Sequence, residues 1–465
     1  MLATAITPYA QWLNPGDNAW QMTAATFVGL MSIPGLAVLY GGVMQKRWSV
    51  NSMMLTFIGF AVVMVAWALW AFKMGFGSPI HLFGAGAGSF FSNMVGNPQS
   101  ILGHVGLQHQ AAIPLLVGFI PKLHFPEASL FYFQFVFAAI TPLLMLGSVL
   151  GRINFKAWIP FVLLWITFVY AINAFLIWGG GYFGAHGALD YSGGYVIHLS
   201  AGVSGFVAAW VIGPRLKRDR EIDAPNNLLM VATGAGLLWL GWNGFNGGDP
   251  YFAGASASAA VVNTNLCTAV AMLAWIGWDL IYKDKPSLIG TVNGMITGLV
   301  GITPAAGYVN GYGAIIIGVV ATTVVWMSIR YLSRVWPFRV VDDTLGVIYT
   351  HGIAGLVGGL LVGLLSDPNM NIYHGLTNFT GLFQPSGNAT LLRWQAETAL
   401  WVIVFSGIVT FVLLKLVGLV ISLRHTDEDL EIGDHAIHGH EVYPADVASL
   451  GTFGTTPALQ PAAPA

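Results

Sequence analysis

The fold is decided by a stretch of sequence that occurs twice: Asp190-Tyr-Ser-Gly-Gly-Tyr-Val-Ile-His198-Leu-Ser-Ala-Gly-Val-Ser-Gly205 and Asp343-Thr-Leu-Gly-Val-Ile-Tyr-Thr-His351-Gly-Ile-Ala-Gly-Leu-Val-Gly358. Both copies read D-x7-H-x2-A-G-x2-G, and each lies in an apolar run long enough to cross a bilayer as a helix. A shorter shared element, Ile-Thr-Pro, stands at residues 140–142 and again at residues 302–304. The chain therefore contains an internal repeat, in which a first set of hydrophobic segments resembles a second.

The composition of the whole chain indicates a membrane protein. Of 465 residues, 55% are hydrophobic and only 8% are charged, whereas soluble proteins carry roughly 25% charged residues. This composition excludes a soluble globular domain and a disordered chain. Cys267 is the single cysteine, so no internal disulfide can form, and the formal net charge of −2 excludes a polyanion-binding surface spread over the protein. We predict an all-α polytopic membrane protein.

Eleven apolar segments without internal charge are each long enough to span a bilayer, which takes roughly 20 residues. They lie near residues 20–42, 51–72, 128–150, 158–177, 192–213, 228–246, 257–278, 288–308, 313–329, 345–366 and 398–414. We therefore expect a transmembrane domain over residues 1–424, with helices 1–5 in about 20–213, helices 6–10 in about 228–366 and helix 11 in about 398–424. Residues 425–465 form a tail, and its last ~20 residues, rich in Ala, Pro and Thr, are predicted to be disordered.

The positively charged residues indicate which ends of the helices lie inside the cell. With the N-terminus outside, fourteen of the 18 lysines and arginines fall in inside loops and three fall in outside loops. The fourteen are Lys46, Arg47, Arg152, Lys156, Arg215, Lys217, Arg218, Arg220, Lys283, Lys285, Arg330, Arg334, Arg339 and Arg424; the three are Lys73, Lys122 and Arg393. We expect the N-terminus outside and the C-terminus in the cytoplasm.

The repeat predicts where its two histidines lie. Because each unit has five segments, the second unit enters the membrane in the opposite direction, as in many transporters. His198 follows Asp190 by eight residues, roughly 12 Å along a helix, and His351 stands at the same distance from Asp343. Approaching from opposite faces of a layer about 30 Å thick, the two rings should meet near its middle. They either line a path or pack between helices, and ligation of a haem is a third interpretation.

The longest predicted loop, residues 76–127, faces the outside and carries an apolar run at residues 111–120. Ten residues are too few to span a bilayer. We expect the run to form a helix that lies at the membrane interface or packs against the transmembrane domain.

Several motifs resemble those of the Amt/Mep/Rh family of ammonium transporters, on its Amt side. They are WGGGYFGAHGALDYSGGYVIH at residues 178–198, GWNGFNGG at residues 241–248, Ile33-Pro34-Gly35 with Tyr40-Gly41-Gly42, and Asp342-Asp343 with His351-Gly352. The resemblance covers about residues 16–444. It implies transport of ammonium and methylammonium across the inner (plasma) membrane by a homotrimer with eleven helices and one pore per subunit.

The resemblance also implies roles along the pore. Trp178 would gather the cation at the outer mouth, since aromatic faces attract cations, and Phe137 and Phe245 would form a two-ring gate below it, rather than simply pack in the core. His198 and His351 would stabilise neutral ammonia, because a neutral imidazole offers one donor and one acceptor. Further pore residues would be Trp242, Gln134 and Thr303. We expect ammonium to lose a proton near the gate, with NH3 and H+ crossing by separate routes and net charge moving.

Two aspartates stand at the predicted outer end of the pore. Asp190 matches the family's pore aspartate, which would hold backbone near the outer cation site, and an ordinary helix N-cap is the alternative. Asp249 departs from the family, which commonly has a serine hydroxyl there. We predict that its carboxylate strengthens cation recruitment, the alternative being that the turn made with Pro250 points it into solvent.

The tail resembles the family's regulatory C-terminus at residues 431–434 (EIGD) and 438–441 (HGHE), although His440 interrupts the usual His-Gly-Glu. This implies a PII-type signal protein at the cytoplasmic face, the alternative being a simple solvated tail. A membrane sensor that binds ammonium is the rival function; about 41 residues follow the last helix, which we expect to be too few for a signalling domain. We expect no enzymatic activity, cofactor, bound metal or nucleic-acid partner.

Overall fold

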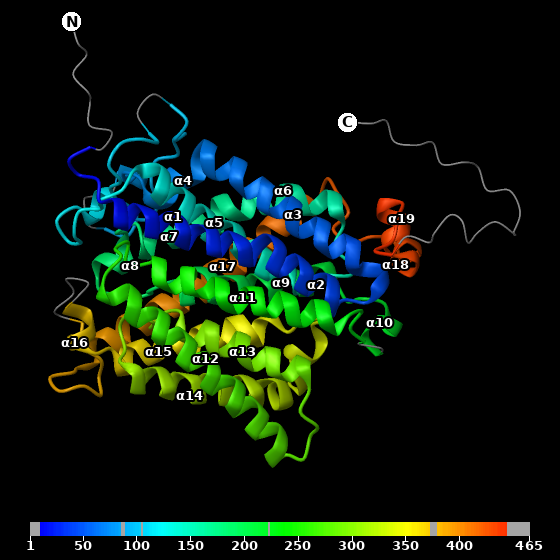
Figure 1. Ribbon diagram of the computed structural model, residues 1–465. Helices are drawn as coiled ribbons and strands as arrows, with labels where there is room; N and C mark the ends of the chain where they lie inside the picture. The colour runs from blue at the N-terminus through cyan, green and yellow to red at the C-terminus, as the bar shows by residue number, and fades with distance from the viewer. Residues whose placement is uncertain (1–9, 85–88, 104–105, 222–223, 373–378, 444–465) are drawn as a thin grey trace, which may run out of the picture.

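The computed structural model describes residues 10–84, 89–103, 106–221, 224–372 and 379–443. Within these ranges all regular elements are helices, and the only β-type pairing consists of isolated bridges in the segments that connect them. Figure 1 shows the long helices lying side by side, with their ends gathered at two opposite faces. The residues predicted to be disordered, 445–465, lie outside the described ranges.

The predicted segments correspond to helices, several of which are interrupted by π-helical turns. The first five are α1 (Pro15–Leu30) with η1 (Met31–Gly35) and α2 (Leu36–Val43), α3 (Ser49–Ala66) with η3 (Trp67–Ala71) and α4 (Phe72–Phe76), α5 (Glu127–Leu146), α6 (Phe155–Trp165) with η6 (Ile166–Tyr170) and α7 (Ala171–Ile177), and η7 (Gly194–Leu199) with α9 (Ser200–Ile212). The next six are α11 (Leu228–Gly248), α12 (Ala255–Ile281), α13 (Leu288–Ile302), α14 (Gly311–Tyr331), η10 (Ile348–Ile353) with α15 (Ala354–Leu365), and α17 (Ala389–Gly418).

Short helices complete the described chain. They are η2 (Lys46–Trp48), η4 (Leu82–Gly84), η5 (Pro114–Leu116), α8 (Tyr182–Ala185), α10 (Lys217–Glu221), η8 (Leu332–Arg334), η9 (Phe338–Val340), α16 (Pro368–Asn371), α18 (Asp427–Ile432) and α19 (Asp434–His438). Among the described residues, ten helices are long and apolar enough to cross a membrane, and Leu288–Ile302 is a shorter apolar helix. The all-helical membrane fold is confirmed, while the count of eleven spans stays a prediction.

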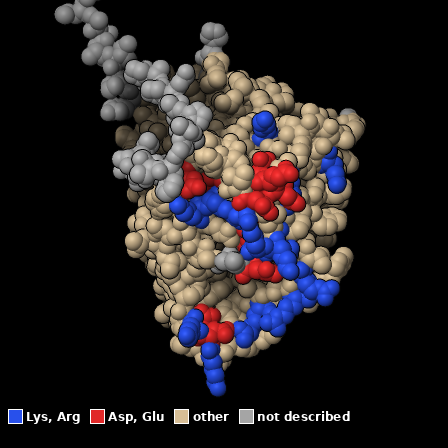
Figure 2. All heavy atoms as spheres, turned by 90° about the vertical axis from the view of Figure 1, so that its right-hand side faces the viewer, with Lys and Arg blue, Asp and Glu red and all other residues tan. Residues whose placement is uncertain are grey.

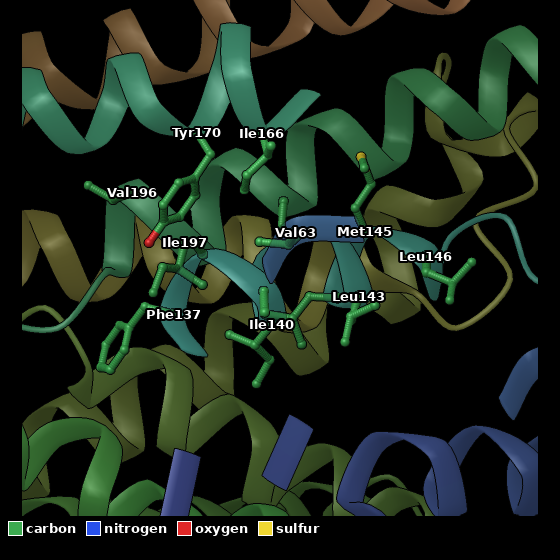
Figure 3. Packing of buried hydrophobic residues seen from close by; sticks show 14 of the residues in the cluster. Val63, Phe137, Ile140, Leu143, Met145, Leu146, Ile166, Tyr170, Val196 and Ile197 are labelled. Carbon is green, nitrogen blue, oxygen red and sulfur yellow. The ribbon is translucent and has the colours of Figure 1, made fainter. Parts of the chain in front are cut away.

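Helix α5 is the central helix of the domain. Of its apolar window, 94% is buried, whereas the last long helix, α17, buries only 33% and offers most of its surface to the surroundings. Figure 3 shows Phe137, Ile140 and Leu143 of α5 in the hydrophobic core, together with Val63 and Ile197 from other helices. A side chain on α5 is therefore surrounded by protein on all sides, and one placed there can close a path through the domain.

The two copies of the repeated motif cross each other at their glycines. A Cβ atom on Gly202 would lie 2.4 Å from the Cα of Gly352, and one on Gly355 would lie 2.5 Å from the carbonyl oxygen of Gly194. These distances are below any real Cβ contact, so only glycine allows the backbones to approach so closely. The A-G-x2-G part of the motif thus brings the two histidine-bearing segments together.

Each histidine sits in a π-helical turn with an aspartate just before it. His198 lies in η7 and His351 in η10, and the Asp343 carboxylate accepts a hydrogen bond of 2.8 Å from the backbone N–H of Ile348 in η10. The carboxylate satisfies an amide that has no partner within the helix, as an N-cap does. Its equivalent, Asp190, does the same in η7.

The two faces of the domain differ in charge. We call the face that carries the loop between α4 and α5 the loop face, and the face that carries α10, α18 and α19 the tail face (Figure 1). Figure 2 shows the tail face, where lysines and arginines form a broad band beside several carboxylates. The predicted gathering of basic residues at one face is therefore present, and the assignment of that face to the cytoplasm stays a prediction.

The tail is packed against the tail face rather than free in solvent. The Asp434 carboxylate accepts hydrogen bonds of 2.8 Å from the backbone N–H groups of Val50 and Asn51, at the start of α3. Gly433 has a φ of 82°, and a Cβ there would lie 2.4 Å from the carbonyl oxygen of Arg47. Asp434 therefore caps a membrane helix that lies almost 400 residues earlier in the chain.

The apolar run at residues 111–120 does not form the predicted helix. Its only helical part is the three-residue turn η5, and it lies at the loop face, where Phe119 is exposed and Ile113 is buried. Pro114 and Gly118, whose φ is 93°, interrupt any longer helix. The run is a folded loop segment that packs against the domain.

Candidate conduction pathway

The two histidines of the repeat meet, as predicted from their spacing. The Nδ1 atoms of His198 and His351 lie 3.2 Å apart, a hydrogen bond in which one ring donates and the other accepts. Both rings are buried, and the Nε2 atom of His198 has no hydrogen-bond partner among the described residues. A buried nitrogen without a partner is costly, so it is suited to a small polar guest.

An aromatic stack leads from the loop face to the histidines. The rings of Phe137 and Phe245 lie 4.3 Å apart and both side chains are fully buried, so they block the path between them. Trp178 meets Phe137 edge-on at 6.2 Å. On the other side, Trp242 lies 5.0 Å from Phe245 and stacks at 5.5 Å on His198. Trp178, the two gate rings, Trp242 and His198 therefore form one continuous column of rings.

The remaining predicted pore residues hold others in place. The indole N–H of Trp242 donates to the Thr303 hydroxyl at 2.9 Å, so Thr303 fixes the ring that faces His198. The side-chain amide of Gln134 donates to the Tyr251 hydroxyl at 2.8 Å, near the mouth. Thr303 thus lies beside the histidine pair, whereas Gln134 lies away from it.

Asp190 acts as a helix cap. Its carboxylate accepts hydrogen bonds from the backbone N–H groups of Gly193, Tyr195 and Val196, at 3.2, 2.9 and 3.0 Å. Its carbonyl oxygen accepts from the indole N–H of Trp178 at 2.6 Å. Burial raises the pKa of Asp190 to about 6, although the backbone hydrogen bonds oppose this rise. The residue therefore fixes both the start of η7 and the tryptophan at the mouth.

Asp249 stands at the end of α11 and is half-buried. Its carboxylate accepts a hydrogen bond from the Ser192 hydroxyl, whose oxygen also lies 2.8 Å from the carbonyl oxygen of Phe245. Burial raises the pKa of Asp249 well above its usual range, while the Ser192 hydrogen bond opposes the rise. The side chain is thus turned toward the gate, and not into solvent as the Asp249-Pro250 alternative required.

A cavity opens on each side of this column. The loop-face cavity has a volume of about 180 Å³ and is lined by Trp178, Asp190, Asp249, Tyr251 and Tyr308, among others. The tail-face cavity has a volume of about 450 Å³ and no charged residue among its lining, which includes Trp242 and His351. The histidines and the gate therefore separate an acidic, aromatic cavity from a larger neutral one.

Two residues of the site escaped prediction from the sequence. Ser192 links Asp249 to the gate. It lies inside the motif at residues 178–198, in which roles were predicted only for other residues. Tyr251 has a φ of 62°, a left-handed conformation that is unusual for a non-glycine residue. The Asp249-Pro250 pair was the available signal for a tight turn at this position.

The profile of the Ammonium Transporter Family matches residues 19–443. Ammonium transporter 3 member 2 of Oryza sativa subsp. japonica is 46% identical over 446 residues, covering 93% of this chain and 91% of that protein. Ammonium transporter 2 of Arabidopsis thaliana is 47% identical over 435 residues, covering 93% and 89%.

Solved structures agree with these sequence matches. The crystal structure of Candida albicans Mep2 superposes with a TM-score of 0.76 at 26% identity, covering 90% of this chain and 88% of that chain. A sensor Amt protein, 20% identical, has the same TM-score of 0.76 and shares the fold. By the length of the profile match and the identity to its relatives, the chain belongs to the Ammonium Transporter Family.

Proposed function

We propose that this protein transports ammonium, and methylammonium with it, through the column between the two cavities. The observation that carries the proposal is the buried His198–His351 pair, 3.2 Å apart, directly behind the stacked rings of Phe137 and Phe245. The family and the relatives' names support the substrate. The test is uptake of labelled methylammonium into transporter-deficient cells, with His198→Ala as the control, which we expect to lose most of the uptake. Equal uptake by the variant would reject the role of the pair.

We further propose that ammonium loses a proton before it reaches the histidines. The gate is fully buried, and a bare cation there would pay a desolvation penalty of several kcal/mol. Neutral ammonia avoids this penalty and can accept or donate one hydrogen bond to an imidazole. The proton then takes a separate route, and net charge moves. Electrical recording on reconstituted protein tests this step, and ammonium uptake without current would contradict it.

Asp249 is proposed to recruit the cation on the loop face. Its carboxylate lines the same cavity as Trp178, and a low-dielectric wall focuses the field of a single charge. We expect Asp249→Ser to raise the ammonium concentration that gives half-maximal transport. An unchanged value would reject recruitment, and transport would then depend on the aromatic rings alone.

The assembly and placement of the protein are also proposals. We expect a homotrimer in the inner (plasma) membrane, with the loop face outside, the tail face in the cytoplasm, and a PII-type signal protein bound at the tail face. The basic band and the docked tail give that face a charged and ordered surface on which a partner protein can bind. A mass measurement on the protein in a native-like membrane tests the trimer, and labelling of introduced cysteines from each side tests the orientation.

A sensor is the alternative function, and its support is the fold shared with a sensor Amt protein at 20% identity. That likeness concerns the fold alone. Transport and sensing make different predictions, because a sensor binds ammonium without moving it. Uptake in transporter-deficient cells separates them directly.

A further inference from the structure

The loop-face cavity is larger than ammonium needs. Its volume is about 180 Å³, whereas one water needs roughly 10–15 Å³ and an engineered apolar cavity of about 150 Å³ holds a benzene molecule. Ammonium is about the size of water. The space around Asp249 therefore has room for an organic group of several carbon atoms attached to a cationic nitrogen.

The lining of this cavity suits an organic cation. Asp249 supplies a carboxylate, and no lysine or arginine lines the cavity to compete for it. Trp178, Tyr251 and Tyr308 supply aromatic faces, which attract a positive charge. The carboxylate of Asp190 is occupied by backbone N–H groups. Of the two carboxylates that line the cavity, Asp249 is thus the one that can accept hydrogen bonds from a cationic head.

The rest of the wall is apolar and comes from the folded loop. Leu116 and Ile120, from the apolar run at residues 111–120, line the cavity together with Trp178. The loop is held there by close packing: a Cβ on Gly180, whose φ is 79°, would lie 2.7 Å from the Cβ of Leu115. The loop therefore covers the mouth with hydrocarbon at a fixed place, within one cavity of the carboxylate.

We propose that the loop-face cavity binds primary alkylammonium ions of about three to five carbons, and that these ions compete with ammonium. The –NH3+ head contacts Asp249 and the aromatic rings, and the alkyl chain lies on Leu116 and Ile120. The closed rings of Phe137 and Phe245 hold such an ion at the mouth. The competition with ammonium rests on the proposed transport function, whereas the binding of alkylammonium ions in the cavity does not depend on it.

The test measures inhibition of labelled methylammonium uptake by ethyl-, propyl- and butylammonium in cells that make the full chain. Burying a methylene contributes up to about 0.8 kcal/mol, so the inhibition constant should fall roughly twofold to fourfold with each added carbon. Butanol, which has the chain without the charge, should not inhibit. Equal inhibition by all three amines would overturn the proposal.

Three variants locate the site. Leu116→Ala together with Ile120→Ala should flatten the dependence on chain length, while Val117→Ala is the matched control, since Val117 is 67% exposed and does not line the cavity. Asp249→Asn should weaken inhibition by all three amines by a similar factor. A dependence on chain length that survives the Leu116 and Ile120 double change would place the amines elsewhere and contradict the proposal.

A binding measurement separates this inference from the transport function. The purified protein should show a rise in melting temperature with butylammonium that exceeds the rise with ethylammonium, because a ligand that binds only the folded state stabilises it. If uptake fails but this difference persists, the proposed transport is wrong and the cavity assignment stands. If uptake proceeds and the difference is absent, the cavity assignment is wrong.

Discussion

The two cavities of this protein differ from each other, although the helices between them are arranged as two similar copies. The histidines, the capping aspartates and the glycines of the crossing come in pairs, one from each copy of the motif. By contrast, the gate rings, Trp178 and Asp249 belong to one side only, and the tail-face cavity has no charged residue in its lining. The repeat therefore supplies the paired features of the column, and the loop face alone adds the gate, the tryptophan and the Asp249 carboxylate.

The largest effect should come from disrupting the glycine crossing of the two repeated motifs, which lies between both cavities. Gly355→Leu places a side chain where a Cβ already lies 2.5 Å from the carbonyl oxygen of Gly194 and 3.1 Å from the Cβ of His198. Overpacking of this kind costs about 1–3 kcal/mol or more, so we expect a marked loss of folded protein. The yield of monodisperse protein in detergent measures it. Gly236→Leu is the control, because nothing lies within 4 Å of a Cβ there, and an equal loss for both variants would contradict the crossing as the cause.

The next effect concerns the charge that only the loop-face cavity has. Burial raises the pKa of Asp249 well above its usual range, so the carboxylate loses its charge as the loop-face pH falls through that raised pKa. The ammonium concentration for half-maximal transport should then rise severalfold on acidification. Asp249→Asn should show a higher value with a weaker dependence on pH, because only Asp190 still titrates in the cavity. Uptake measured against external pH checks this. A wild-type curve parallel to that of the variant would show that the charge plays no part.

A smaller effect is expected from giving the tail-face cavity a charge of its own. Asn293 lines that cavity, and Asn293→Asp adds a carboxylate there. Transport from the tail face should reach half-saturation at an ammonium concentration about threefold lower, which corresponds to the ~0.5–1 kcal/mol of a partly exposed cation pair. Transport from the loop face should not change. Vesicles of both orientations make the measurement, with Asn293→Ala as the neutral control.

The smallest effect concerns the tail beside the tail-face cavity. The pKa of Asp434 rises to about 6 because burial outweighs its hydrogen bonds to Val50 and Asn51. The docked tail therefore binds protons more readily than the free tail, and this contribution to docking is lost as pH rises through about 6. The protection of the Val50 and Asn51 amides against hydrogen exchange, taken relative to the intrinsic exchange rate at each pH, should be greater at pH 5 than at pH 7. In Asp434→Asn this difference in protection should vanish; weaker protection at the lower pH in the wild type would contradict the argument.

The sequence predicted those parts of the site that follow from periodicity. The spacing from Asp190 to His198, repeated in the second copy, predicted that the two histidines meet, and they do, although the helical part of this stretch begins only at Gly194. The positions of Phe137 and Phe245 came from resemblance to a family, since one phenylalanine in an apolar helix looks like any other. The Ser192–Asp249 contact joins segments more than 50 residues apart, and no local pattern encodes such a contact.

Loops were predicted less well than helices for the same reason. The run at residues 111–120 is apolar enough for a helix, but its proline and glycine, and its close packing against Gly180, direct it into a folded turn. A helix forms its hydrogen bonds within its own segment, so local composition predicts it. The conformation of a loop depends on contacts with distant segments, which local composition does not predict.

The π-helical turns that carry the histidines make the pathway sensitive to chain length in a way that substitutions do not reveal. Each residue of a helical turn rotates the chain by roughly a quarter of a full turn. Removing one residue from η7 would rotate Asp190 by that angle relative to His198, so that the carboxylate could no longer cap the turn or hold Trp178 through its carbonyl group. A substitution between these residues changes the packing of one buried side chain, whereas a single deletion should break the link between the cap and the histidine wherever it falls.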